Sequence, residues 1–284
     1  PRVDTHVYAR ENGWMIAALC EYYAATGDAS ALQQAQSAVR WIMLHRSVAG
    51  GGFAHGERDV AGAYLGDTLA MGQAFVALYT VTGNRGNLDA AAAAARFIGG
   101  HFAPLSAGGG FVTSRIATDS GTRPRPDRDE NIALVRFLSV LAVATGHTGF
   151  HGNAEEAMRF LASPQVASKP LSAGVLLAHQ DFTEAPLHVT VLGSRHDPSF
   201  NALYSAALRS ITSHELIETR DPSDPHPAPS TIAYPNLSRP ALFLCTAHAC
   251  SSPIFEADQV RARIERAERP LGQANVQQTL AHAQ

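Results

Sequence analysis

Three segments of this sequence align with one another without gaps, and this internal repeat restricts the fold more than any other feature. They are ENGWMIAALCEYYAATGD from Glu11, DTLAMGQAFVALYTVTGN from Asp67 and ENIALVRFLSVLAVATGH from Glu130. The offsets of 56 and 63 residues between them also hold in the segments that follow, where one aromatic position recurs as Trp41, Phe97 and Phe160. Each repeat is therefore one structural unit made of two parts.

Both parts of each repeat are predicted to be α-helices. Apolar residues recur at helical spacing, as in Ile16, Leu19 and Tyr22, and a Thr-Gly pair ends each first helix, where a left-handed C-cap is expected. Common helical solenoids have periods of about 34 to 47 residues, which are shorter than these. We therefore expect a mainly α protein, in which the hairpins form an incomplete α/α-toroid of alternating inner and outer helices.

A glycine-rich turn separates successive repeats. The sequence Gly-Gly-Gly-Phe occurs at residues 50–53 and again at 108–111, in each case between the second helix of one repeat and the first helix of the next. We interpret it as the device that carries the chain from an outer helix back to an inner one. The His-Gly-Glu-Arg sequence that follows the first copy does not recur.

The pattern changes after about Ser163. β-Branched and apolar runs predict strands, the stretch 221–240 is rich in Pro and Ser and is expected to be a loop, and charged amphipathic spacing predicts a final helix. The expected strands are 187–193, 214–219 and 241–245, and the expected helices are 199–211 and 256–268. We predict helical hairpins over residues 1–165, a small α/β segment over 166–268 and a flexible tail over 269–284.

Composition excludes several classes of function. A net charge of -3 without a basic stripe argues against a nucleic-acid partner. No apolar run reaches the roughly 20 residues that span a bilayer, and no signal peptide opens the chain. Three cysteines do not make a disulfide framework, so we expect a soluble cytoplasmic protein in a reducing compartment.

The CTAHAC segment leaves three alternatives open. Cys245, His248 and Cys250 provide three local ligands where a structural zinc site commonly has four. A disulfide is disfavoured in a reducing compartment. We expect two buried thiols at the end of a strand, no metal and no cofactor. Cys20 lies among apolar residues and is expected in the core.

Three motifs resemble the YyaL-like, spermatogenesis-associated proteins, which carry an N-terminal thioredoxin domain: VDTHVYARENGWMIAAL, YLGDTLAMGQAFVALYTVTGN and ALFLCTAHACSSPI. The resemblance extends from about Val3 to Ile264. It implies an α/α-barrel related in fold to six-hairpin glycosidases and N-acylglucosamine 2-epimerases. The family's thioredoxin domain and first hairpins have no counterpart in the sequence given, and Glu11 stands where the family usually has Trp. The resemblance therefore implies a fragment or a shortened relative, whose open flank is covered by an N-terminal thioredoxin-like domain or a second copy of the chain.

The repeat places an acid at one equivalent position three times, as Glu11, Asp67 and Glu130. In a toroid these helix starts meet at one rim, where carboxylates form a cup suited to sugar hydroxyls and to general acid/base catalysis. His55 in the preceding loop is the fourth catalytic candidate, because a group with a pKa of about 6.5 takes up and returns a proton at neutral pH. The alternative is that the acids only cap helices and that His55 is a structural or solvent-exposed residue.

Five further residues are predicted to bind substrate. They are Asn12, Phe53, Arg58, Phe111 and Asn131. The two phenylalanines follow the glycines and would stack on a sugar face; the alternative is that they fill the space between helices below the rim.

Two hypotheses of function follow. In the first, the chain is a carbohydrate-binding or carbohydrate-modifying module that resembles an epimerase or a glycosidase. In the second, it is a non-catalytic scaffold that packs against a missing domain or partner. A terpenoid or prenyl-transfer toroid is a distant third, since its Asp-rich motifs are absent. The sequence does not decide whether the chain is an enzyme, because fold does not fix function.

Overall fold

The structure is a computed structural model that divides the chain into two compact units. The first unit extends to Ala185, and the residues described from Pro186 onward belong to the second. The described residues are 3–57, 59, 63–115, 124–170, 173–210, 215–221, 232–246 and 249–268.

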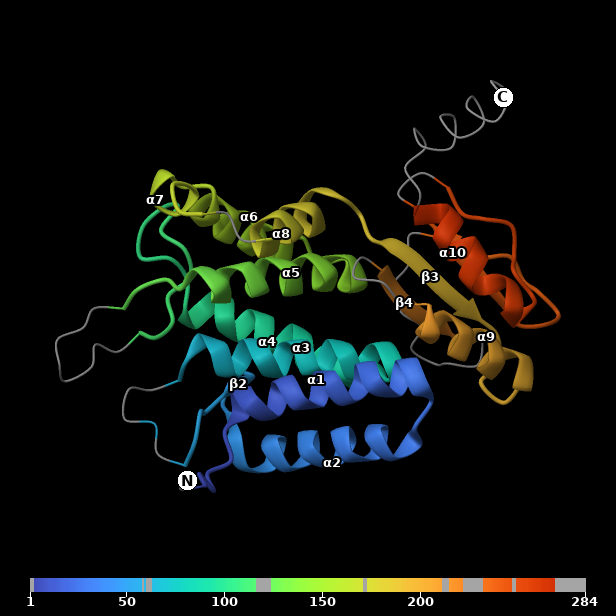
Figure 1. Ribbon diagram of the computed structural model, residues 1–284, viewed down its shortest axis with the longest axis horizontal. Coiled ribbons are helices and arrows are strands. Elements are labelled where there is room, and N and C mark those ends of the chain that lie inside the picture. The colour runs from blue at the N-terminus through green and yellow to red at the C-terminus, as the bar shows by residue number, and fades with distance from the viewer. Residues whose placement is uncertain are drawn as a thin grey trace. The chain divides into compact units, whose positions relative to one another are not determined.

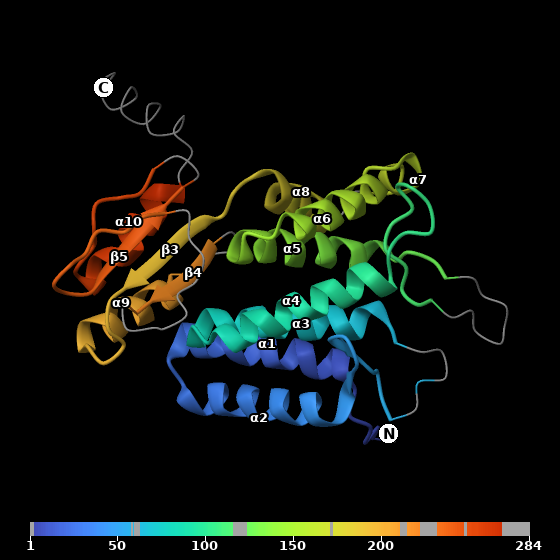
Figure 2. The ribbon, with the colours of Figure 1, turned by 180° about the vertical axis from the view of Figure 1, so that it is seen from behind.

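In the described residues, three helical hairpins form most of the first unit (Figure 1). Their helices are α1 (Ala9–Thr26), α2 (Ala29–Arg46), α3 (Leu65–Thr82), α4 (Arg85–His101), α5 (Arg128–Thr145) and α6 (Thr148–Leu161). The helices α1, α3 and α5 lie side by side in both views, and each packs against the second helix of its own hairpin (Figure 2). The predicted hairpins are confirmed, and all three first helices begin at positions related by the repeat offsets.

The same local chemistry turns the chain in each hairpin. A left-handed glycine ends the first helix: Gly27 has φ 76°, Gly83 has φ 62° and Gly146 has φ 67°. This conformation costs glycine little, because it has no Cβ. The next residue caps the second helix by accepting a hydrogen bond from the backbone N–H two residues later. These caps are Asp28, Asn84 and His147.

The glycine-rich turns lie close against the following hairpin. After α2 the chain forms two paired two-residue strands, β1 (Ser47–Val48) and β2 (Gly52–Phe53). A Cβ atom on Gly52 would lie 2.4 Å from the ring of Phe97 on α4, so no side chain fits there. This close packing supports the interpretation of the glycines as structural residues that carry the chain from one hairpin to the next.

Two short helices follow the hairpins: α7 (Pro164–Ala167) and α8 (Ala173–Thr183). The helix α8 packs against α5, where the Arg136 Nε atom lies 2.7 Å from Oδ2 of the buried Asp181. The structure groups this helix with the hairpins.

The second unit contains a three-stranded sheet in the order β4-β3-β5. Strand β3 (Leu187–Leu192) runs parallel to β4 (Glu215–Arg220) and antiparallel to β5 (Ala241–Cys245). Helix α9 (Pro198–Arg209) connects β3 to β4, and η1 (Ala257–Gln259) and α10 (Val260–Glu268) follow β5. The predicted strands and helices of this segment are confirmed, and the predicted tail lies outside the described residues.

The cysteines require a correction. Cys245 and Cys250 form a disulfide, where we expected two thiols. The physical reason is local: the chain turns back after β5, and an antiparallel bridge pairs the two residues directly. A zinc site built on both sulfurs is thereby excluded, and His248 lies outside the described residues. Cys20 is buried, as expected, and burial raises the pKa of its thiol to about 12.

Candidate functional site

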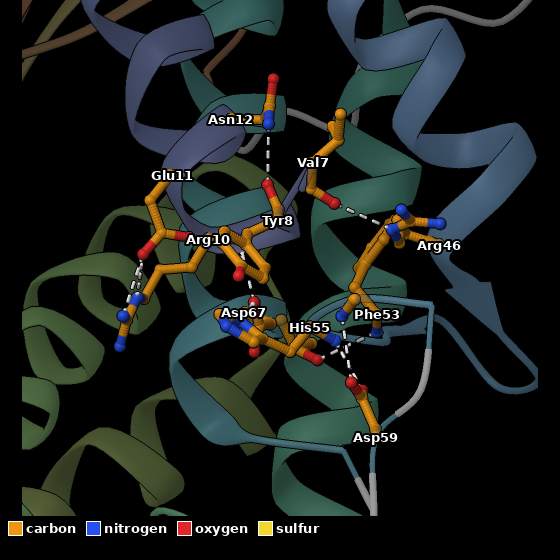
Figure 3. A network of polar contacts seen from close by, with 12 residues as sticks. Val7, Tyr8, Arg10, Glu11, Asn12, Arg46, Phe53, His55, Asp59 and Asp67 are labelled. Carbon is orange, nitrogen blue, oxygen red and sulfur yellow. Dashed lines mark hydrogen bonds and ion pairs between the residues drawn. The ribbon is translucent and has the colours of Figure 1, made fainter. Parts of the chain in front are cut away.

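The predicted acids at the starts of α1 and α3, Glu11 and Asp67, both contact Arg10 (Figure 3). The guanidinium of Arg10 lies 2.9 Å from Oε1 of Glu11, and its backbone N–H donates a hydrogen bond of 2.9 Å to Oδ1 of Asp67. Burial raises the pKa of Glu130 of α5, and the positive charge of the nearby Arg10 acts in the opposite direction. The toroid rim thus brings the three carboxylates into one neighbourhood, although each makes different contacts.

Asp67 is buried and pairs with His55. Its Oδ1 atom lies 2.9 Å from Nδ1 of the imidazole. Burial raises the pKa of Asp67, while the hydrogen bonds from His55 and from the Arg10 N–H act in the opposite direction. By accepting the Arg10 N–H, Asp67 satisfies a free amide in the first turn of a neighbouring helix rather than of its own. The capping alternative therefore describes part of its role.

His55 is held on several sides. Its ring stacks on Tyr8 with 4.5 Å between centroids and meets Tyr64 edge-on at 6.0 Å. Its backbone N–H donates to Oδ2 of Asp59 at 2.6 Å, which fixes the loop (Figure 3). The imidazole is therefore oriented by a buried carboxylate and by aromatic contacts, the arrangement that a positioned acid or base requires.

Glu130 occupies a different environment. Its Oε2 atom accepts a hydrogen bond of 2.7 Å from the Thr113 hydroxyl. Burial raises the pKa of Glu130; the bond from Thr113 opposes this, and the charge of Asp127 adds to it. A Cβ atom on Gly66 would lie 2.8 Å from Oε1 of Glu130 and 3.2 Å from Cδ of Arg10, so the glycine leaves room for both side chains.

Glu11 is tied to Arg10 through one carboxylate oxygen. Its other oxygen, Oε2, is enclosed and has no hydrogen-bond partner within the described residues. An enclosed carboxylate oxygen without a donor is costly. A buried water molecule is the usual partner of such an enclosed oxygen.

A cavity of about 410 Å³ opens beside Glu130. The side chains of Arg10 and Trp14 border it from α1, Gln73 borders it from α3, and Thr113 and Glu130 complete this polar wall. Trp14 is exposed, and Cζ of Arg10 lies 5.2 Å from its ring centroid. Within the described residues, His55 and Asp67 do not line this cavity. The site therefore has two parts, a carboxylate at a cavity and a separate histidine–aspartate pair.

The predicted substrate-binding residues are placed elsewhere. Phe53 and Phe111 are only 4 % and 1 % exposed, so they fill the space between helices and present no face to a ligand. Asn131 Oδ1 accepts a hydrogen bond of 2.9 Å from the Phe111 N–H. Asn12 donates through Nδ2 to the Tyr8 carbonyl at 2.8 Å. The packing alternative thus describes the two phenylalanines and Asn131.

Sequence reasoning identified Glu130 but missed the other residues of the cavity wall, Arg10, Trp14, Gln73 and Thr113. Arg58 lies outside the described residues. Arg10 and Trp14 stand four positions apart on one helix and therefore share a face, so their spacing around Glu11 was a usable signal. The sequence holds no comparable signal for Thr113 and Gln73, because only the tertiary fold brings them close to Glu130.

None of the helices in the described parts of the chain is both long enough and apolar enough to cross a bilayer. No protein-family model matches the sequence, and no curated protein matches it. The resemblance to the YyaL-like family therefore stays a prediction.

Solved structures do match the chain. A family 76 glycoside hydrolase from a bovine Bacteroides thetaiotaomicron strain is 13% identical with a TM-score of 0.51; the match covers 74% of this chain and 49% of that one. A complex of an inactive α-1,6-mannanase variant from Salegentibacter with α-1,6-mannotriose is 12% identical, with a TM-score of 0.49 and coverages of 72% and 55%. A cellobiose 2-epimerase from Bacillus thermoamylovorans is 14% identical, with a TM-score of 0.46 and coverages of 55% and 44%.

The chain thus spans about half the length of the solved structures it matches. The likeness to the family 76 enzyme shows the fold alone: the hairpins have the α/α-toroid arrangement of six-hairpin glycosidases, as expected from the sequence.

Proposed function

We propose that the chain binds a neutral carbohydrate in the cavity beside Glu130 and that Glu130 transfers a proton to or from it. The observation that carries the proposal is a partly enclosed carboxylate at a cavity that also presents an exposed indole and a guanidinium. Sugars offer both an apolar C–H face and many hydroxyls. An aromatic ring together with a few convergent polar groups suits such a ligand.

The electrostatics favour an uncharged ligand. Asp127 and Asp129 border the cavity together with Glu130. Arg10, the arginine that the described part of the chain places at this wall, is already paired with Glu11. An anionic sugar would face several carboxylates, so neutral sugars are the expected class.

Glu130 is the residue we assign to proton transfer. Its pKa is raised by burial, and a raised pKa brings a carboxylic acid closer to the range in which it exchanges protons at neutral pH. His55 and Asp67 are assigned a positioning role, because their pairing holds the start of α1 at the cavity wall through the Arg10 N–H. Of the residues that the sequence predicts to be catalytic, this proposal keeps Glu130 for proton transfer and gives His55 and Asp67 the positioning role.

The test is a panel of neutral sugars, D-mannose, cellobiose and α-1,6-mannotriose, with glucuronic acid as the anionic comparison. Binding is measured by calorimetry, isomerisation or epimerisation by uptake of deuterium from D2O at carbon, and hydrolysis by release of reducing ends. We expect binding of a neutral sugar and loss of turnover in Glu130→Gln. The matched control is Glu155→Gln, an exposed glutamate of α6 paired with Arg159.

Three results would overturn the proposal. The first is no binding by any of the neutral sugars, the second is preferential binding of glucuronic acid, and the third is turnover that survives Glu130→Gln. Failure of binding across the panel would support the alternative of a non-catalytic scaffold.

A further inference from the structure

At the joint between the first and second hairpins, the glycine-rich turn after α2 makes two contacts that recur at the next joint. The backbone N–H of Phe53, in the turn after α2, donates a hydrogen bond of 3.1 Å to the Thr68 hydroxyl on α3. The neighbouring Gly52 lies against the ring of Phe97 on α4, with room for no side chain. The turn of one hairpin therefore contacts a polar side chain and an aromatic ring of the next hairpin. We call these two residues, Thr68 and Phe97 at this joint, the receiving pair.

The joint between the second and third hairpins repeats both contacts. The N–H of Phe111 donates to Oδ1 of Asn131 on α5 at 2.9 Å. A Cβ atom on Gly110 would lie 2.5 Å from the ring of Phe160 on α6. Two successive joints thus use one geometry, and the repeat predicts the receiving residues in any other hairpin.

The first hairpin carries the same receiving pair, Asn12 and Trp41. Asn12 donates to the carbonyl four residues earlier, as Asn131 does. Its Oδ1 points away from the polar network and has no donor within the described residues (Figure 3). Trp41 stacks on the histidine one turn later, as Phe97 does, but it is 38 % exposed where Phe97 is 5 % exposed.

The face of α1 beside this pair is apolar and uncovered. Met15 and Tyr22 are 58 % and 54 % exposed. At the equivalent positions of the second and third hairpins the side chains are at most 1 % exposed: Met71, Leu78, Leu134 and Leu141. Exposed apolar side chains at positions that the repeat otherwise buries mark an interaction surface.

We propose that this face receives a further helical hairpin of the same repeat, whose glycine-rich turn and Phe dock between Asn12 and Trp41. Asn12 and Trp41 specify the chemistry of the partner. The amide oxygen of Asn12 requires a backbone N–H donor, and the indole of Trp41 requires a stretch of glycine residues packed against it. A second copy of this chain does not supply them, because both of its Gly-Gly-Gly-Phe turns are already held in its own joints.

The experiment supplies the partner in register. A second copy of residues 9–64 is inserted between Tyr8 and Ala9, which places its Phe the same 15 residues before Asn12 as Phe53 is before Thr68. Trp14→Phe in both copies and Trp41→Phe in the inserted one leave the native Trp41 as the single indole. Acrylamide quenching of this indole is compared with that of the Trp14→Phe chain without the insert.

We expect the quenching constant to fall severalfold, as for a side chain whose exposed fraction drops from 38 % towards the 5 % of Phe97. The matched control has Gly52→Val in the inserted copy only, which removes the close approach and restores quenching. Equal protection in this control, unchanged quenching, or an insert that adds no helical signal by circular dichroism would each overturn the proposal. So would a concentration-dependent dimer of the chain without the insert in which Trp41 is protected. None of these measurements depends on catalytic activity or sugar binding, so the outcome is independent of the proposed function.

Discussion

The close approach of α1 and α3 makes one substitution unusually informative. A Cβ atom on Gly13 would lie 2.7 Å from the backbone carbon and 2.8 Å from the backbone oxygen of Ala70, whereas ordinary contacts begin at 3.4 Å. In Gly13→Ala the two helices must therefore separate locally by about 0.7 Å. The bond from the Arg10 N–H to Asp67, one turn away, would lengthen from 2.9 Å to about 3.6 Å and cease to be a hydrogen bond.

The net effect on stability has two parts of opposite sign. Losing a hydrogen bond to a charged group costs about 1.5 to 3 kcal/mol. Replacing a glycine by alanine inside a helix stabilises by about 0.5 to 1 kcal/mol. We expect Gly13→Ala to lower the free energy of unfolding by about 0.5 to 2.5 kcal/mol, which corresponds to a decrease in Tm of about 1 to 10 °C for a unit of this size.

The assay is thermal unfolding followed by tryptophan fluorescence, because both tryptophans lie in the first unit. Gly152→Ala is the matched control: it makes the same change inside α6, where nothing lies within 4 Å of the added Cβ atom. This variant should be stabilised by about 0.5 to 1 kcal/mol. If Gly13→Ala were stabilised equally, the close approach of the two helices and the reasoning built on it would be refuted.

Three more predictions rest on contacts already described. Thr68→Val leaves the buried Phe53 N–H without an acceptor and should cost about 1 to 3 kcal/mol in denaturant unfolding; an unchanged midpoint would contradict this. Burial raises the pKa of Asp67 and of Glu130, so the folded state binds more protons than the unfolded state just above their ordinary pKa values. The contribution of both groups to stability should fall as pH rises through that window, and Glu130→Gln should flatten the slope of unfolding free energy against pH; an unchanged slope would argue against it. Burial raises the pKa of Cys20 to about 12, so iodoacetamide at pH 8 should label this thiol only after unfolding, as read by mass spectrometry; rapid labelling of the native protein would disprove its burial.

The helical hairpins were predictable because their signals are local. The residue that ends each first helix and the residue that caps each second helix are neighbours in the sequence, as Gly27 and Asp28 show. Because the repeat presents these signals three times, equivalent helices could be predicted to begin and end at equivalent positions. The disulfide was not predicted, since a spacing of five residues between Cys245 and Cys250 is compatible with thiols, a disulfide or metal ligands, and the expected reducing compartment favoured thiols.

The candidate site was predictable only in part. The repeat alignment put Glu11, Asp67 and Glu130 at one rim, because equivalent helix starts meet there in a toroid. The alignment could not predict how the surroundings of the three carboxylates differ, because these depend on residues of the loops. His55 contacts Asp67, and Thr113 contacts Glu130. Such contacts follow from tertiary packing and have no signature in residue type or spacing.

The joints between hairpins also bear on how the chain folds. The bond from Phe53 to Thr68 closes over 15 residues and the bond from Phe111 to Asn131 over 20. Contacts between residues so near in sequence require little loop closure and favour fast folding. Each turn meets its receiving side chain as soon as the next helix begins to emerge during synthesis. The hairpins of the first unit should therefore assemble in chain order, each completed joint serving as the template on which the next one forms.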